Sequence, residues 1–170
     1  MRKIKKKQVK DSSQLAYTGN VTIKVVKDKE VVKVINGHNS GNTRLFEYIA
    51  KCLVGLYESI NAPKYVQCFH STSATPDLNN LDSLSGIIPV SSLTYNTDAE
   101  SSTAKLTFTI PGNIFPEDAE VNFFALYNYK EYENKANPMA TYYSETPLTN
   151  IDTSSNVIVV WELQVGNATN

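Results

Sequence analysis

Residues that commonly build catalytic and metal sites are scarce in this sequence. Its 170 residues include only two cysteines and two histidines. Two cysteines are too few for a disulfide framework, so we expect Cys52 and Cys68 to be reduced thiols inside the protein. No zinc-protease motif, nucleophile elbow or phosphate-binding glycine loop occurs in the sequence, and no pair of residues forms a credible acid–base set. We therefore expect a protein without enzymatic activity and without a cofactor.

Long apolar runs are also absent. No stretch approaches the roughly 20 consecutive apolar residues of a membrane-spanning helix, so we expect no membrane partner. Residues 10–20 follow a basic start, but they are polar and do not form the apolar core of a secretion signal. The hydrophobic share of 41% is normal for a globular protein, and 170 residues suffice for one domain with a sizeable core.

The best candidate for a metal site is the segment Cys68-Phe69-His70. Residues two apart on a strand face the same way, so Cys68 and His70 would both reach one ion, and Cys52 and His38 would complete four ligands. A buried thiol beside a surface imidazole explains the same residues more simply. We therefore predict no metal site.

Two other groups of side chains have both a functional and a plain explanation. Three acidic residues precede a predicted strand and would suit Ca²⁺, although a solvated loop is far more common; they are Glu117, Asp118 and Glu120. Five tyrosines would offer a stacking face for a sugar, although tyrosine is equally frequent at protein interfaces; they are Tyr127, Tyr129, Tyr132, Tyr142 and Tyr143.

Basic residues are concentrated at the start of the chain. Six of the 16 Lys and Arg residues lie in the first ten positions: Arg2, Lys3, Lys5, Lys6, Lys7 and Lys10. The remaining chain holds ten basic and 17 acidic residues, a net charge of −7. We predict a basic arm over residues 1–17 and a single domain over residues 18–170. Such an arm would reach an acidic neighbour, which would be an identical subunit, another protein or a nucleic acid such as DNA, and a solubilising tail is the plain alternative.

One convincing helix is predicted, near residues 43–57. Ser40, Asn42 or Thr43 would cap it, and a row of apolar residues recurs at helical spacing: Leu45, Ile49, Leu53 and Leu56. Few polar positions interrupt it, so we expect the helix to be mostly buried.

The rest of the chain reads as β-strand. The first two strands should form a hairpin around residues 27–30, with Val32 and Val34 sharing the inner face of Val21, Ile23 and Val25. The segment of residues 86–95 is interrupted by Pro89, which suggests one weak edge strand. A polar loop over residues 71–85 should be mobile or make contacts. The strand at residues 156–165 should bury Trp161. About eight strands are expected, an antiparallel β-sandwich with one inserted helix: 20–26, 31–36, 64–70, 86–95, 103–110, 121–129, 139–145 and 156–165.

Several segments together resemble a known class of protein. They are the hairpin strands Val21-Thr22-Ile23-Lys24-Val25 and Val34-Ile35-Asn36, the turn into Leu45-Phe46-Glu47-Tyr48, the strand Leu106-Thr107-Phe108-Thr109-Ile110-Pro111, and the closing strand Val160-Trp161-Glu162-Leu163-Gln164-Val165-Gly166-Asn167. With them the chain resembles the small β-sandwich virion proteins that form collar or tail rings of short-tailed phages, notably crAss-like phages of gut bacteria. The resemblance covers residues 21–167 and includes no catalytic residue.

The resemblance implies a structural subunit of a tailed-phage virion, assembled in the cytoplasm of a bacterial host. We expect a closed homo-oligomeric ring of the tail or head-to-tail connector, with contacts to other virion proteins through the loops and the arm. The alternatives are a capsid decoration or head-fibre protein, and a carbohydrate-binding β-sandwich module.

Overall fold

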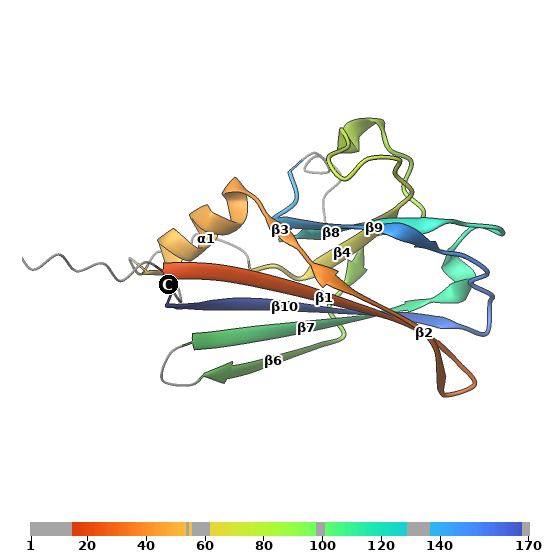
Figure 1. The fold of residues 1–170 in the computed structure, drawn as a ribbon, viewed down its shortest axis with the longest axis horizontal. Coiled ribbons are helices and arrows are strands. Elements are labelled where there is room, and N and C mark those ends of the chain that lie inside the picture. Colours follow the sequence, from red (N-terminus) through yellow and green to blue (C-terminus); the bar gives the residue numbers. More distant parts are fainter. Residues whose placement is uncertain (1–14, 54, 56–61, 98–100, 129–136, 168–170) are drawn as a thin grey trace, which may run out of the picture.

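Two β-sheets face each other across a shared hydrophobic core in the computed structural model (Figure 1). The structure describes residues 15–53, 55, 62–97, 101–128 and 137–167. The first sheet has the strand order β2-β1-β10-β7-β6 and the second β3-β9-β8-β4-β5, with all neighbours antiparallel. The predicted antiparallel β-sandwich is confirmed, with ten strands among the described residues in place of about eight.

The elements follow the chain in a simple order. The strands are β1 (Leu15–Lys27), β2 (Glu30–His38), β3 (Ser40–Gly41), β4 (Tyr65–Phe69), β5 (Ile88–Pro89), β6 (Ser92–Thr97), β7 (Ser101–Pro111), β8 (Val121–Tyr127), β9 (Ala140–Leu148) and β10 (Asn156–Asn167). One α-helix, α1 (Thr43–Leu53), and two single-turn 3₁₀-helices, η2 (Leu78–Asn80) and η3 (Gly112–Ile114), complete the set among these residues.

The β1–β2 hairpin turns through Asp28 and Lys29, which both have positive φ, at 51° and 68°. Positive φ at both central residues is what a two-residue hairpin turn requires. A register shift follows immediately, because one extra residue of β2 is accommodated next to Val25. The bulge moves every later side chain of β2 to the opposite face.

This bulge makes one sequence prediction wrong. Without it Ile23 would pair with Val34, but with it Ile23 pairs with Ile35, and Val34 pairs with Lys24 on the outer face. Val32 and Val34 therefore do not share the inner face of β1, and both are exposed.

Helix α1 begins where Asn42 caps it. The Asn42 side-chain oxygen accepts a hydrogen bond from the backbone N–H of Arg44 at 3.0 Å, so Asn42 is the cap among the three predicted candidates. The helix was expected over residues 43–57, and of its last four positions only Gly55 is described, in a turn.

The expectation that α1 is mostly buried is wrong. Leu45 is buried, and Tyr48 and Ile49 pack partly against the core, but Phe46 remains 49% exposed on the other side. The Phe46 ring meets Tyr17 edge to face, with ring centroids 5.8 Å apart. The helix lies at the end of the sandwich where β1 begins (Figure 1), and among the described residues only Tyr17 makes an aromatic ring contact with Phe46.

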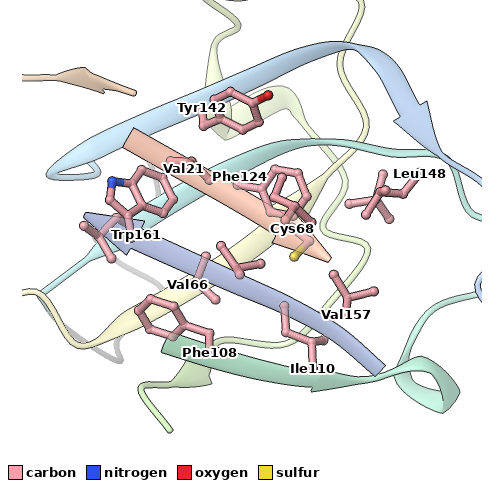
Figure 2. Close-up of a cluster of buried hydrophobic side chains, with 14 of the residues drawn as sticks. Val21, Val66, Cys68, Phe108, Ile110, Phe124, Tyr142, Leu148, Val157 and Trp161 are labelled. Carbon is pink, nitrogen blue, oxygen red and sulfur yellow. The ribbon is translucent and has the colours of Figure 1, made fainter. Parts of the chain in front are cut away.

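The main core lies between the two sheets (Figure 2). Strict alternation along β7 and β10 supplies much of it, and Trp161 is fully buried, as predicted. Burying one large apolar side chain stabilises the fold by about 1.5–3 kcal/mol. The labelled side chains of this cluster are Val21, Val66, Cys68, Phe108, Ile110, Phe124, Tyr142, Leu148, Val157 and Trp161.

A smaller cluster covers the outer face of the second sheet. Leu78, from the polar loop that follows β4, is buried against Phe69, Phe123 and Tyr127. All seven residues of β8 are consequently buried. Of the two alternatives for this loop, the structure therefore supports contact with the sheet.

The segment of residues 86–95 forms two strands in different sheets, not one. β5 pairs with β4 in the second sheet, and β6 pairs with β7 in the first. The chain crosses between them at Val90, whose N–H donates to the Lys64 carbonyl, and at Ser91, whose N–H donates to the Thr107 carbonyl, both at 2.7 Å. Pro89 lacks an N–H and cannot continue a ladder, which ends β5 and permits the crossing.

β1 begins at Leu15, which pairs with Asn167. The last three residues of the predicted arm are therefore part of the sheet, and the rest of the arm lies outside the described residues. Within the described part of the chain, no helix has the length and apolarity needed to cross a membrane.

Candidate assembly surface

The structure does not bring the four candidate metal ligands together. Cys68 points into the core, fully buried (Figure 2), and burial raises the pKa of its thiol to about 12, while a hydrogen bond with Ser85 opposes the shift. His70 lies just beyond the end of β4, is exposed, and places its Nδ1 3.1 Å from the Glu120 carbonyl oxygen. The two side chains therefore have different surroundings.

The other two candidate metal ligands, His38 and Cys52, lie on different elements. His38 is exposed at the end of β2. Cys52 is half-buried on α1 and interacts with Tyr48, whose pKa is raised by burial and by this thiol. Among the described residues, no group of three or more His, Cys, Asp or Glu side chains could hold a metal ion.

The described tyrosines do not form a stacking face. Tyr127 is buried in the outer cluster of the second sheet, and burial raises its pKa. Tyr142 is buried on the opposite face of that sheet, in the main core (Figure 2), while Tyr143 packs partly against the outer cluster. These three tyrosines therefore do not form the stacking face that the sequence left open as one alternative, and Tyr129 and Tyr132 lie outside the described residues.

The three acidic candidates lie on the surface at one end of the sandwich. Glu117, Asp118 and Glu120 are all exposed in the connection between η3 and β8. This connection follows β7, whose last residue, Pro111, lies at the same end of the sheet as the β1–β2 turn (Figure 1). The turn adds two further acidic residues, Asp28 and Glu30.

A hydrogen-bonded ion pair organises the loop beside this end. The Lys27 ammonium lies 2.6 Å from Asp152 Oδ2, while Asp152 Oδ1 accepts hydrogen bonds from Ser154 N–H and from the Ser155 hydroxyl at 2.9 Å. The Lys27 contact is the main reason that the pKa of Asp152 lies well below its ordinary value. Lys27 is thus engaged by Asp152.

Exposed large apolar side chains gather mainly on the two edge strands of the first sheet. Five of the seven lie on β2 or β6, the strands at opposite edges. They are Val31, Val32 and Val34 on β2, and Leu93 and Tyr95 on β6; Phe46 and Ile114 lie elsewhere.

β2 carries two features that hinder pairing with another strand. The bulge beside Val25 distorts its ladder, and Lys33 points inward and donates through Nζ to the Pro147 carbonyl at 2.9 Å. Bulges and inward-pointing charges are common protections of free edges. The edges of the second sheet are short, because β3 and β5 have two residues each and β5 ends in Pro89.

β6 has none of these protections. Its six residues are uncharged and all exposed, and they pair with β7 without a register shift. Leu93 and Tyr95 pair with the inward-facing Leu106 and Ala104, yet they are 59% and 66% exposed. Their face points toward the second sheet, which ends at the short β5, so this part of β6 extends past its cover.

Sequence reasoning missed β6 as a separate strand. It merged residues 92–95 into one strand with the segment around Pro89 and left residues 96 and 97 outside any strand, although the run Ser92-Leu93-Thr94-Tyr95-Asn96-Thr97 is uncharged and rich in strand-forming residues. That uncharged run was the available signal. The basic candidates of the arm, from Arg2 to Lys10, lie outside the described residues.

Comparison with known proteins identifies no relative, since no family model, no curated protein and no solved structure matches this chain.

Proposed function

We propose that this protein is a structural subunit of a tailed-phage virion that assembles into a closed homo-oligomeric ring of the tail or head-to-tail connector. The observation that carries the proposal is the placement of exposed acidic residues at the end of the sandwich opposite to Leu15, where the described chain begins after the basic segment of the sequence. The basic arm leads into Leu15 at one end of β1, and the exposed acidic residues of the η3–β8 connection lie at the other. The sequence resemblance to phage ring proteins supports the same function.

The length of β1 separates these two charged regions. Its 13 residues span about 40 Å at roughly 3.3 Å per residue. In a head-to-tail arrangement, the acidic end of one subunit lies beside the start of β1 in the next subunit. An arm that precedes β1 would therefore reach the acidic end of the neighbouring subunit more readily than the acidic end of its own subunit. Repeated head-to-tail contacts generate a ring when the rotation closes. The assembled ring would be part of the virion, formed in the bacterial cytoplasm.

The alternatives have less support. A capsid decoration or head-fibre protein would use the same kinds of contact at another place in the virion. A carbohydrate-binding module depended on a tyrosine face, and of its three described members Tyr127 and Tyr142 are buried and Tyr143 is half-buried.

The first experiment neutralises the three acidic side chains of the η3–β8 connection. A triple variant, Glu117→Gln, Asp118→Asn and Glu120→Gln, should keep its fold and lose assembly, as measured by light scattering and negative-stain images. The matched control neutralises three exposed acidic residues elsewhere: Glu47→Gln, Asp82→Asn and Glu145→Gln. Equal effects of the two triple variants would contradict a specific arm contact.

The second experiment deletes residues 1–10. The deletion should leave the melting temperature of the monomer nearly unchanged and weaken assembly, most clearly at low salt, because the Debye length shrinks from about 10 Å at 0.1 M to about 3 Å at 1 M. Salt-dependent DNA binding that disappears on deletion would indicate an arm that contacts DNA instead. If the shortened protein assembles normally and neither form binds DNA, the arm is a solubilising tail.

A further inference from the structure

We propose that β6 is a docking edge for a second copy of this chain, joined antiparallel across a twofold axis that passes through Thr94. The contact would extend the first sheets of two subunits into one continuous ten-stranded sheet. The proposal does not depend on the ring or on the arm, because it rests on the described residues of β6 and their pairing with β7.

The choice of β6 follows from a comparison of the four sheet edges. β3 and β5 are too short to template a partner strand, and β2 is hindered by its bulge and by Lys33. β6 offers six residues in regular register with β7, and no described strand pairs with its second side. An exposed, flat and uncharged edge of this kind is a template for another strand.

A second copy is favoured as the occupant because β6 is complementary to itself. A strand pairs poorly with its own copy when like charges oppose each other, and residues 92–97 carry no charge. The arm is a poor alternative occupant, since six cations placed along an uncharged strand would find no counter-charge there.

The pairing register follows from the two faces of β6. A continuous sheet requires inward-facing residues to oppose inward-facing residues. Leu93 and Tyr95 face inward, so the register that centres on Thr94 sets Leu93 of each copy against Tyr95 of the other. The same register pairs Thr94 with its own copy and Ser92 with Asn96.

This register also covers the exposed apolar surface. Leu93 and Tyr95 are 59% and 66% exposed in one subunit, because the second sheet stops short of them. In the pair, the two leucines and two tyrosines would meet beneath the joined strands. Aromatic–aliphatic cross-strand pairs are among the favourable ones in antiparallel sheets.

The test is a symmetric disulfide. In a Cys52→Ser background, Thr94→Cys should form a disulfide-linked dimer under mild oxidation. Directly opposed residues of antiparallel strands have Cα atoms about 4.5–5.5 Å apart, within the range of about 4.4–6.8 Å that a disulfide accepts.

Asn96→Cys is the matched control, since Asn96 is exposed on the same face of the same strand. In the proposed register the two Asn96 positions lie four residues apart, about 13 Å, so this variant should form no disulfide-linked dimer under oxidation. Mixing Asn96→Cys protein with Ser92→Cys protein should give mixed disulfide dimers.

A second measurement needs no cysteine. Tyr95→Lys should weaken the dimer by at least about tenfold in light scattering, because two introduced cations lie at the centre of the contact. The side chain is exposed in the monomer, so circular dichroism and the melting temperature of the diluted protein should remain those of the wild type.

Three results would overturn the proposal. The first is a wild-type protein that stays monomeric at its highest soluble concentration. The second is equal disulfide crosslinking of Thr94→Cys and Asn96→Cys. The third is a different protein that binds β6 while Thr94→Cys forms no disulfide-linked dimer. Dimers without larger assemblies would support the β6 contact and contradict the ring. Larger assemblies without the Thr94 disulfide would support the ring and contradict the β6 contact.

Discussion

The backbone of Gly19 lies directly against the side-chain amide of Asn39. A Cβ atom at Gly19 would fall 1.4 Å from that amide, and the backbone N–H of Asn39 donates to the Gly19 carbonyl at 3.0 Å. With its oxygen turned toward the indole, the amide accepts from the Trp161 Nε1–H and from the Tyr17 hydroxyl, and its nitrogen donates to the Gly19 carbonyl at 2.8 Å. Burial raises the pKa of Tyr17 to about 12. The contact thus ties β1, the β2–β3 link and β10 together.

Gly19→Ala should therefore destabilise the protein by about 1–3 kcal/mol, the usual cost of overpacking a filled site. Asn39→Ala should also destabilise it, because the buried indole N–H loses its acceptor. The double variant should lose less than the sum of the two, since removing the amide makes room for the new methyl group. Denaturant unfolding measures all three. Strict additivity would show that the two residues do not compete for the same space.

The two cysteines should differ sharply in reactivity. Cys68 is fully buried with its pKa raised to about 12, so almost no thiolate is present near neutral pH, whereas Cys52 is half-buried on the helix. A thiol reagent should modify one cysteine per native chain and two after unfolding. Cys52→Ser should leave no reactive thiol in the native protein. Rapid modification of that variant would mean that the core opens around Cys68.

Acid should weaken the fold partly through Asp152. Its pKa in the folded protein lies below the ordinary value of 3.8, mainly because of Lys27, so its contribution to stability is complete above about pH 4 and is lost as the pH falls further. Asp152→Asn should be less stable than wild type near neutral pH but lose less of its melting temperature between about pH 5 and pH 2. Asp82→Asn, at an exposed aspartate of the loop after β4, should follow the wild-type curve. If the Asp152→Asn and wild-type curves run parallel, the ion pair is without effect.

The core strands were predictable because their alternation is local. Along β10, and along β7 from Leu106 onward, every second residue is large and apolar, and Phe108 and Trp161 are buried as that pattern requires. The hairpin position and the cap at Asn42 also follow from short-range chemistry. The side of the sheet on which Val34 lies did not follow from short-range chemistry, because a single bulge reverses the alternation of β2.

The candidate site was less predictable than the fold. Glu117, Asp118 and Glu120 were recognised from sequence as an acidic group, but their position opposite the start of β1 depends on how seven intervening strands pair. The exposure of Leu93 and Tyr95 depends on the length of β5, which belongs to the other sheet.

By itself the sequence determined the long strands, the segment in which the helix begins and the core side chains of β7 and β10, because these follow from side-chain periodicity and from turn chemistry within a few residues. The tertiary structure alone decided which sheet each strand joins, which face the polar loop covers, and which edge remains open. Those outcomes depend on contacts between residues far apart in the chain, and no local pattern records that Leu78 covers β8 while nothing described covers the inner face of β6 at Tyr95.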